Sequence, residues 1–335
     1  MHHIDVFNGD ADGICALHQL RLANPVTDSR PSVCDTPSVC DTLVTGVKRD
    51  INLLARLHDL HGQSVTVLDI SLDKNRDSLV RLLDQDNRVL YVDHHFSGDI
   101  PDHPNLEVHI DPDPLVCTSI IIDRLLEGHH RPWAVVGAFG DNLDESAEKL
   151  GQSCGLSGED LTILRETGIL LNYNGYGASL EDLFFHPAEL YRLVHEYDDP
   201  LEFHATSPAI QTLRQGYRDD MERAAACKPF YQSPSGRLYE LPSEPWARRV
   251  AGVFSNTLAR EQVDLAHGIL TRNSDQTYRV SIRAPLARRS GADTLCRRFP
   301  TGGGRAAAAG INQLDESLLD RFIQAFDQQF SPQEP

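Results

Sequence analysis

The sequence predicts an α/β protein built from an N-terminal, doubly wound parallel sheet and a smaller C-terminal α/β domain. In the first part of the chain, apolar runs of strand length alternate with helix-length segments, a pattern typical of parallel sheets with helices on both faces. Farther along, two strand-like runs flank a short turn and indicate an antiparallel pair. The 335 residues, 40% hydrophobic and 24% charged, suffice for two or three domains. We expect a domain over 1–170, a mostly helical connector over 171–235 and a domain over 236–335.

The elements of the N-terminal domain follow from hydrophobic periodicity. A helix over Gly13–Ala23, for example, places Ile14, Leu17 and Leu20 on one face. The expected strands are Ile4–Asn8, Leu43–Thr45, Val65–Ile70, Val89–Val92 and Val135–Phe139, and the further helices are Asp50–Leu60, Lys74–Leu83 and Cys117–Leu126. Ligands of such sheets bind beyond the carboxyl ends of the strands, so residues just past each strand are site candidates.

The remainder of the chain is expected to pass from helices into a second α/β domain. The connector contains a polar, glycine-rich loop, Asn172–Gly177. Beyond it, the expected strands are Arg237–Leu241, Ala266–Thr271 and Thr277–Arg283, and the expected helices are Trp246–Ala259, Ala292–Phe299 and Glu316–Phe330. Near the N-terminus, the direct repeat of Pro31–Thr36 in Pro37–Thr42 is interpreted as a duplication within a surface loop.

Composition and charge exclude several classes of protein. The formal net charge is −18, whereas proteins that hold long nucleic acids carry a basic surface. A short phosphate substrate remains compatible, because bound metals and a few arginines reverse the field locally. No run approaches the ~20 apolar residues of a membrane span. Met1–Asp5 lacks signal-peptide features and the seven cysteines form no CxxC pair, so we expect free thiols in a cytoplasmic protein.

Acidic residues recur at the predicted strand ends. They lie within Asn8–Gly13, at Asp69, within Asp93–His95 and at Asp141. A single group of this kind is ordinarily a turn, but the carboxyl ends of parallel strands share one edge of the sheet, so four such groups converge. Carboxylates are the ligands that Mg²⁺ and Mn²⁺ favour, and two such cations can clamp a phosphoryl centre. The pattern predicts a site for two hard divalent cations.

Taken in order, these motifs resemble the DHH phosphoesterase superfamily, in the branch with a C-terminal DHH-associated (DHHA1) domain. The matching motifs are Asn8–Gly13, Asp69, Asp93–His95 and Asp141, followed by Arg283 and Phe299–Gly310. The resemblance covers nearly the whole chain. It implies a metal-binding catalytic domain over 1–170, a substrate-binding domain over 236–335 and an active site in the cleft between them.

The resemblance also implies a role for each residue of the site. The catalytic residues would be Asp10, Asp12, Asp69, His94, His95 and Asp141. One cation would be held by Asp10 and Asp69, and the other by Asp12, Asp69, His94 and Asp141, with Asp69 bridging. Asp93 would orient the metal-binding histidine, and His95 would contact the substrate phosphate or assist proton transfer. The cofactors would be two Mn²⁺, with Mg²⁺ and Co²⁺ as alternatives, activating a water without a protein nucleophile.

The expected substrate-binding residues are His95, Arg283, Gly302, Gly303, Gly304 and Arg305. Consecutive glycines let backbone N–H groups approach an anion, and a helix beginning after them would add a favourable dipole. The guanidinium of Arg283 would bind phosphate. Lys48 and Arg49 either add positive charge near the cleft or begin a solvated helix, and the loop Asn172–Gly177 either shapes the substrate site or is a hinge.

Two residues depart from the family pattern. Asn8 stands where relatives often place an acidic residue or have a histidine nearby, so its amide oxygen can bind the first cation without adding charge. Arg305 stands where the glycine motif normally ends in histidine. Because arginine is always charged and forks onto phosphate oxygens, it favours a charged phosphate end over a base or ribose. The alternative for Arg305 is a salt bridge to the acidic N-terminal domain.

The predicted function is Mn²⁺-dependent hydrolysis of short phosphate-linked substrates, such as short oligonucleotides or linear dinucleotides. Hydrolysis of inorganic polyphosphate, which suits Arg305, is the first alternative. A non-catalytic sensor of a phosphate ligand, which Asn8 and Arg305 would permit, is the second. The expected partner is the phosphate substrate, with no long nucleic acid and no membrane, and a homodimer is left open.

Overall fold

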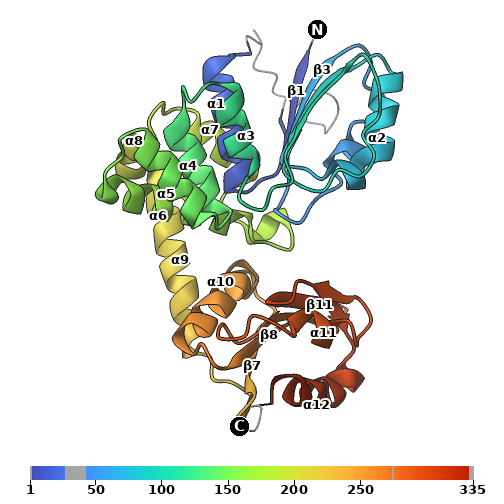
Figure 1. Cartoon of the computed structure of the whole chain (residues 1–335), viewed down its shortest axis with the longest axis vertical. Coiled ribbons are helices and arrows are strands. Elements are labelled where there is room, and N and C mark those ends of the chain that lie inside the picture. Colours follow the sequence, from blue (N-terminus) through green and yellow to red (C-terminus); the bar gives the residue numbers. More distant parts are fainter. Residues whose placement is uncertain (1, 27–42, 274, 332–335) are drawn as a thin grey trace. The chain divides into compact units, whose positions relative to one another are not determined.

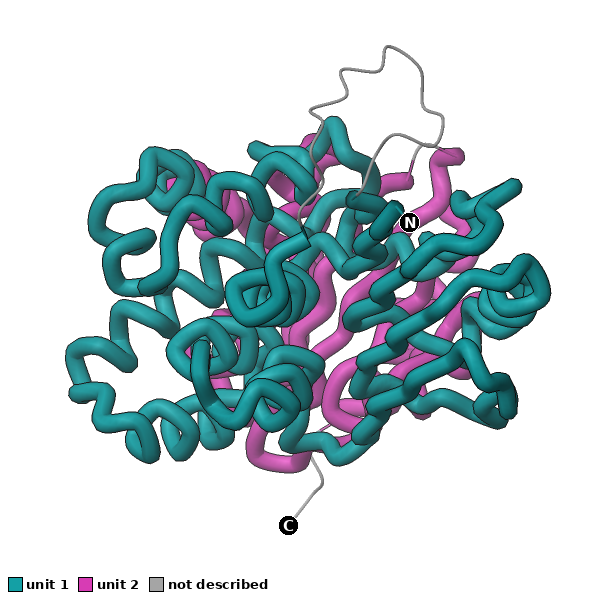
Figure 2. Tube along the Cα trace, turned by 90° about the horizontal axis from the view of Figure 1, so that it is seen from above, with its two compact units in different colours: residues 1–215 teal, residues 216–335 magenta. Residues whose placement is uncertain are grey.

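The computed structural model describes residues 2–26, 43–273 and 275–331, and the chain forms two compact units, Met1–Gln215 and Gly216–Pro335 (Figure 2). Each unit has its own sheet and its own hydrophobic core. The predicted α/β class is confirmed. The three-part division and the cleft between domains stay predictions, and the direct repeat within 31–42 lies outside the described residues.

Unit 1 contains a parallel sheet with the strand order β2-β1-β3-β4-β5. The strands are β1 (His3–Phe7), β2 (Leu43–Val44), β3 (Ser64–Leu68), β4 (Arg88–Asp93) and β5 (Leu106–Ile110). The helices are α1 (Ala11–Ala23), α2 (Leu72–Asp84), α3 (Thr118–Leu125), α4 (Arg131–Gly140), α5 (Asp144–Ser153), α6 (Gly158–Gly175), α7 (Pro187–Val194) and α8 (Pro200–Thr206), with short 3₁₀ turns η1 (Leu53–Arg56) and η2 (Leu180–Asp182). Figure 1 shows α2 on one side of the sheet and α1, α3 and α4 on the other, as a doubly wound sheet requires.

Both faces of the sheet are covered at its central strands, where nearly every residue of β1 and β3 is buried. On one face, Val6 and Val67 belong to a buried cluster with Leu79 of α2. On the other, the ring of Phe7 packs against Tyr191 of α7 at a centroid distance of 5.6 Å. Each such fully buried side chain contributes roughly 1.5–3 kcal/mol. The two covered faces fix the strands, and with them the edge where they end.

Unit 2 contains a mixed sheet with the strand order β10-β11-β9-β8-β7-β6, in which only β7 and β8 pair in parallel among the described strands. The strands are β6 (Tyr231–Ser233), β7 (Gly236–Leu241), β8 (Ala266–Arg272), β9 (Tyr278–Arg283), β10 (Gly302–Gly304) and β11 (Ala308–Leu314). The helices are α10 (Pro245–Glu261), α11 (Ala292–Cys296) and α12 (Leu319–Phe330), with the 3₁₀ turn η3 (Glu316–Leu318). The helix α9 (Pro208–Ala226) spans the division between the units. The predicted antiparallel pair, β8 with β9, is confirmed.

The structure corrects several predicted elements. Val135–Phe139, predicted as a strand, lies within helix α4, because the apolar run begins at Trp133 and a short buried run has no period that separates helix from strand. Asp50–Leu60 is not a helix and contains only η1. The strand β5 was not predicted; its sequence LEVHI alternates apolar and polar residues and lacks the longer apolar run of β4. The predicted loop at 172–177 is mostly the end of α6.

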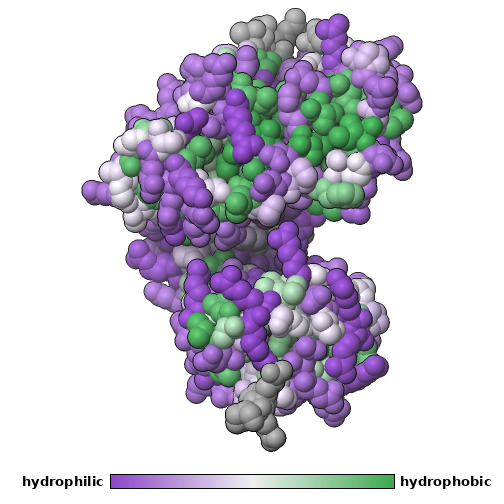
Figure 3. Space-filling model, viewed as in Figure 1, coloured by the Kyte–Doolittle hydropathy of each residue, from purple (hydrophilic) through white to green (hydrophobic). Residues whose placement is uncertain are grey.

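The surface agrees with the charged composition. Figure 3 shows hydrophilic residues over most of the face in view. Within the described residues, no helix combines the length and the apolar character needed to cross a membrane. The described cysteines, which exclude Cys34 and Cys40, are free thiols.

Candidate metal centre

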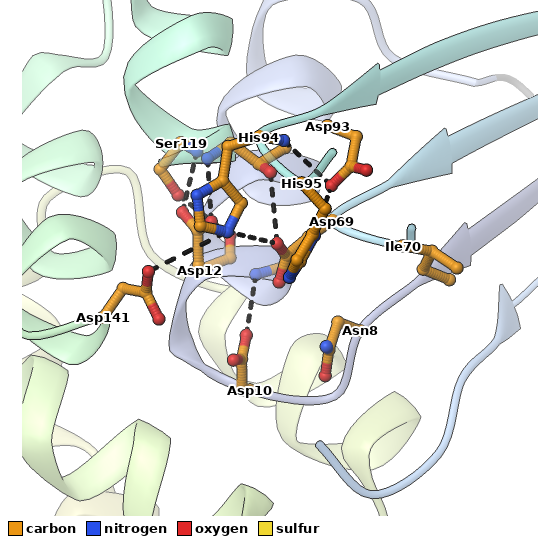
Figure 4. A network of polar contacts seen from close by, with 12 residues as sticks. Asn8, Asp10, Asp12, Asp69, Ile70, Asp93, His94, His95, Ser119 and Asp141 are labelled. Atoms are coloured by element: carbon orange, nitrogen blue, oxygen red, sulfur yellow. Dashed lines mark hydrogen bonds and ion pairs between the residues drawn. The ribbon is translucent and has the colours of Figure 1, made fainter. Parts of the chain in front are cut away.

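The candidate site lies where three parallel strands of unit 1 end. Phe7, Leu68 and Val92 are aligned across β1, β3 and β4, so the residues that follow them emerge at one edge. Figure 4 shows Asn8, Asp10, Asp12, Asp69, His94, His95 and Asp141 gathered there. The convergence predicted from the sequence therefore occurs.

Asp69 occupies the middle of this group. Its side chain is buried, and its backbone has a φ of 60°, a left-handed conformation that few non-glycine residues adopt but that Asp and Asn tolerate. One of its carboxylate oxygens, Oδ1, lies 3.4 Å from Nε2 of His94 and accepts a hydrogen bond from the Thr118 hydroxyl at 3.2 Å. A single oxygen of Asp69 thus contacts side chains from two neighbouring elements.

The imidazole of His94 is oriented by a backbone carbonyl. Its Nδ1 lies 3.0 Å from the oxygen of Val116. Since a carbonyl only accepts hydrogen bonds, Nδ1 donates and Nε2 is the basic atom. That Nε2 faces Asp69 Oδ1 at 3.4 Å and Asp141 Oδ2 at 3.9 Å. His94 is therefore prepared to bind a cation through Nε2.

Asp93 has a different partner from the one predicted. Its Oδ1 accepts the backbone N–H of His94 at 2.9 Å and Nδ1 of His95 at 2.7 Å. Asp93 thus orients the ring of His95 rather than that of His94. His95 also lies near the candidate ligands, since one donor atom each of Asp69, His94 and His95 falls within 4.8 Å of the others.

Asp12 connects the site to the start of helix α3, a contact that was not predicted. Its Oδ2 accepts the N–H of Thr118 at 2.8 Å, and its Oδ1 accepts the N–H of Ser119 at 2.8 Å. These N–H groups begin α3, where the helix dipole favours an anion. Each carboxylate oxygen has a further lone pair, so Asp12 holds α3 in place and still offers oxygen towards the site.

Asp141 enters the site from the end of helix α4. The prediction had placed it at the end of a strand. The helix can approach α1 closely because Gly140 has no side chain, and a Cβ there would collide with Ala11. The carboxylate lies 3.3 Å, through Oδ1, from Nζ of Lys48. The predicted site residue is in place, although its predicted secondary structure was wrong.

Lys48 is part of the acidic group. Its ammonium lies 2.5 Å from Oδ2 of Asp10 and 3.2 Å from Oδ1 of Asn172. Of the two interpretations of this basic residue, the one that brings positive charge to the site is correct. Burial raises the pKa of Asp10, but the adjacent Lys48 outweighs burial, and the pKa of Asp10 is lowered.

The other acids of the site repel one another. Burial raises the pKa of Asp69 well above its usual value, and the charges of Asp10 and Asp12 raise it further. Burial alone would lower the pKa of His94, but contact with Asp69 and the nearby charges of Asp12 and Asp141 raise it to about 10. The same negative field that favours the protonated imidazole favours a bound cation.

The residues present fit a hard divalent cation. The side-chain oxygen of Asn8 is buried without a hydrogen-bond partner, while its nitrogen donates to the carbonyl of Lys48 at 3.4 Å. A buried oxygen without a partner is costly, and a cation would satisfy it. Carboxylate oxygen, amide oxygen and imidazole nitrogen together suit Mn²⁺.

The other predicted substrate residues belong to unit 2. Arg283 ends β9, where its Nε donates to Oδ1 of Asn256 at 2.6 Å and its Nη1 donates to the hydroxyl of Ser281 at 3.2 Å. These bonds hold the guanidinium against the sheet. Arg305 is exposed in the turn between β10 and β11, where its N–H donates to the carbonyl of Ala308 at 2.9 Å.

The glycine run forms strand β10. The prediction that a helix begins after it is wrong, because the alanines continue into strand β11. Two of the glycines have a structural reason. A Cβ on Gly302 would collide with the carbonyl of Cys296. Gly304 has a φ of 135°, which favours glycine, and a Cβ there would collide with Ala309. A Cβ on Gly303 would meet open space, so only this glycine is left without a packing reason.

Comparisons with known proteins agree with the fold. No family model matches the sequence, and neither does any curated protein sequence. A solved structure described as a DHH domain from a member of the s1p family of ribosomal proteins matches with a TM-score of 0.60 at 13% identity, over 97% of this chain and 85% of that one. The exonuclease RecJ bound to manganese matches with a TM-score of 0.55 at 17% identity, over 99% and 91%. A pGpG-specific phosphodiesterase from Vibrio cholerae matches with a TM-score of 0.54 at 13% identity, over 98% of both chains.

The chain therefore has the fold of DHH-domain proteins. The resemblance drawn from its motifs is confirmed at the level of fold.

Proposed function

We propose that this protein is a Mn²⁺-dependent phosphohydrolase that cleaves short phosphate-linked substrates, such as short oligonucleotides or linear dinucleotides. The supporting observation is the group of buried carboxylates and His94 at the carboxyl edge of the unit 1 sheet. The fold is that of a manganese-bound exonuclease and a pGpG-specific phosphodiesterase. A bound divalent cation would activate water and offset the charge of the phosphate.

The side chains of unit 1 divide the work in this proposal. Asp69 and His94 hold the cation together with the surrounding aspartates. His95 contacts the phosphate, because Asp93 fixes its Nδ1 as a donor and leaves Nε2 as the basic atom for proton transfer. Arg283, Gly303 and Arg305 of unit 2 are proposed to bind the substrate.

A substrate panel tests the proposal. The linear dinucleotide pApA, short RNA, inorganic polyphosphate and pyrophosphate are each incubated with the protein and Mn²⁺. We expect turnover of pApA or short RNA that EDTA abolishes and added Mn²⁺ restores. Turnover that survives EDTA contradicts metal dependence. Mn²⁺ binding without hydrolysis of any panel member favours a non-catalytic sensor.

Hydrolysis of inorganic polyphosphate is the second candidate, and exposed Arg305 is the observation that favours it. The guanidinium of Arg305 is permanently charged and donates two hydrogen bonds in parallel, so it suits a chain of phosphates better than a base. Turnover of polyphosphate alone would establish this candidate. In that case Arg305→His is expected to reduce polyphosphate turnover, and an unchanged rate would exclude Arg305 as the determinant.

A further inference from the structure

The family resemblance predicts two cations. The Lys48 ammonium, however, forms an ion pair with Asp10, the carboxylate that the first cation would use. We propose that Lys48 replaces this cation, so that the site operates with one divalent cation and one fixed ammonium. The inference rests on the proposed function and concerns the number of cations in the same site.

The contacts of the ammonium are those of a bound ion. Its Nζ lies 2.5 Å from Oδ2 of Asp10, 3.3 Å from Oδ1 of Asp141 and 3.2 Å from Oδ1 of Asn172. An ammonium has three N–H donors and three oxygens surround it. The oxygens come from the start of α1, the end of α4 and the last turns of α6, so Lys48 joins three helices at one point.

The position of Lys48 is fixed through its backbone as well. Its N–H donates to the carbonyl of Gly175 at 3.0 Å, and its own carbonyl accepts the Asn8 side-chain nitrogen at 3.4 Å. The Asn172 nitrogen donates to the hydroxyl of Tyr176 at 2.8 Å, which leaves the Asn172 oxygen facing Lys48. A solvated surface lysine has no such set of partners.

The charges also favour a single cation. The first cation position offers the neutral amide of Asn8, the carboxylate of Asp10, on which the Lys48 ammonium lies, and the carboxylate of Asp69, which the second cation would share. Hard cations are held by negatively charged oxygens, and no carboxylate at this position is left to a first cation alone. The half that contains Asp69 and His94 keeps its neighbouring carboxylates. A fixed ammonium can stabilise charge on a phosphate without exchanging with solvent.

The wild-type protein provides the first test. Mn²⁺ is titrated by calorimetry, the metal content is measured after desalting, and electron paramagnetic resonance is recorded at saturation. We expect one Mn²⁺ per chain with the signal of an isolated ion. Two Mn²⁺ per chain with a spin-coupled signal overturn the inference. Absence of any Mn²⁺ binding overturns the proposed function itself, so the two failures are distinguishable.

Variants supply the second test. The double variant N8D/K48M adds a carboxylate and removes the ammonium, and we expect it to bind a second Mn²⁺ at least tenfold more tightly than the wild type does. Lys48→Arg keeps a cation in place and should retain one Mn²⁺. The matched control is Lys149→Met, because Lys149 is exposed and pairs with Glu145 at 2.7 Å, away from the site.

Thermal unfolding in EDTA and in Mn²⁺ is recorded for every variant. A folded N8D/K48M protein that binds a single Mn²⁺ with wild-type affinity overturns the inference. If the double variant does not fold, the wild-type stoichiometry decides alone.

Discussion

At the scale of single residues, adjacent histidines of one motif have separate partners. His94 is held by the carbonyl of Val116 and faces the acids through Nε2, whereas His95 is held by Asp93. In each ring, the hydrogen bond at Nδ1 fixes this nitrogen as the donor and leaves Nε2 free. Nε2 of His94 is therefore proposed as a ligand atom, and Nε2 of His95 as the atom that contacts the phosphate.

Asp69 allows a sharp test of the site. Asn tolerates the same left-handed backbone, so Asp69→Asn removes the charge without new strain, whereas Asp69→Ala would add it. We expect Asp69→Asn to lose more than the roughly 10–100-fold in Mn²⁺ affinity that is typical of residues behind the ligands, and to lose turnover. Calorimetry and initial rates measure both. Retained affinity and rate would contradict the position assigned to Asp69.

At the scale of elements, close packing of helices places Asp141. A Cβ on Gly168 of α6 would collide with the carbonyl of Val136 in α4 and lie 2.8 Å from the nitrogen of Gly140. Two helices can approach this closely only where side chains are absent. Helix α4 therefore ends packed against α6, with Asp141 next in the chain.

Gly168→Ala is expected to force α4 and α6 apart. Overpacking of this kind costs roughly 1–3 kcal/mol, and displacement of Asp141 should weaken Mn²⁺ binding as well. The control in the same helix is Gly158→Ala, where a Cβ would meet open space. Urea unfolding and Mn²⁺ titration compare the two variants. If Gly168→Ala is as stable as Gly158→Ala, this account of the contact is wrong.

A buried ion pair joins strand β1 to helix α1. Nε of Arg21 donates to Oδ2 of Asp5 at 3.0 Å, and both side chains are buried. Burial alone raises the pKa of Asp5, but hydrogen bonds from His3 and Arg21 outweigh burial, so the pKa lies below the usual 3.8. The carboxylate therefore adds stability above pH 3.8, and this stability is lost as the pH falls through its lowered pKa.

Asp5→Asn is expected to lower the stability at neutral pH by about 3–5 kcal/mol, because Arg21 remains buried without its partner charge. The difference from the wild type should shrink as the pH falls below 3.8, because the carboxylate of the unfolded chain then binds a proton that the folded carboxylate, with its lowered pKa, does not yet bind. Denaturant unfolding between pH 7 and pH 3 measures it. A difference that stays constant with pH would exclude the ionised carboxylate as its source.

Much of the fold and of the site could be predicted because the signals are local. Strands β1, β3 and β4 are rich in apolar and β-branched residues, and the acidic residues follow them within a few positions of the sequence. The contacts of Lys48 could not be predicted, since Asp141 and Asn172 lie 93 and 124 residues away from it along the chain. The bonds between Asp12 and the start of α3 span more than 100 residues and escaped prediction for the same reason.

At the scale of the whole molecule, each of the two units has buried hydrophobic residues of its own. They include Val67 and Leu79 in unit 1, and Val280 and Phe326 in unit 2. The candidate metal ligands all belong to unit 1. Anything that binds only the folded form of one unit should stabilise that unit selectively.

Calorimetric unfolding is expected to show two transitions, of which Mn²⁺ raises the midpoint of only one. At a Mn²⁺ concentration of 100 times the dissociation constant, the stabilisation should be about 2.7 kcal/mol. EDTA should reverse the shift. A single transition that moves as a whole would show that the units unfold together.

The Lys48–Asp10 contact limits how this site can change during evolution. Loss of Lys48 alone leaves Asp10 buried without its balancing charge, and Asn8→Asp alone adds a buried carboxylate to a group of acids that already repel one another. Each single substitution is thus expected to give a less stable protein, and the effects of the two substitutions on stability are not additive. Residues 8 and 48 should therefore vary as a pair among homologues, with an acid at position 8 where the lysine is missing.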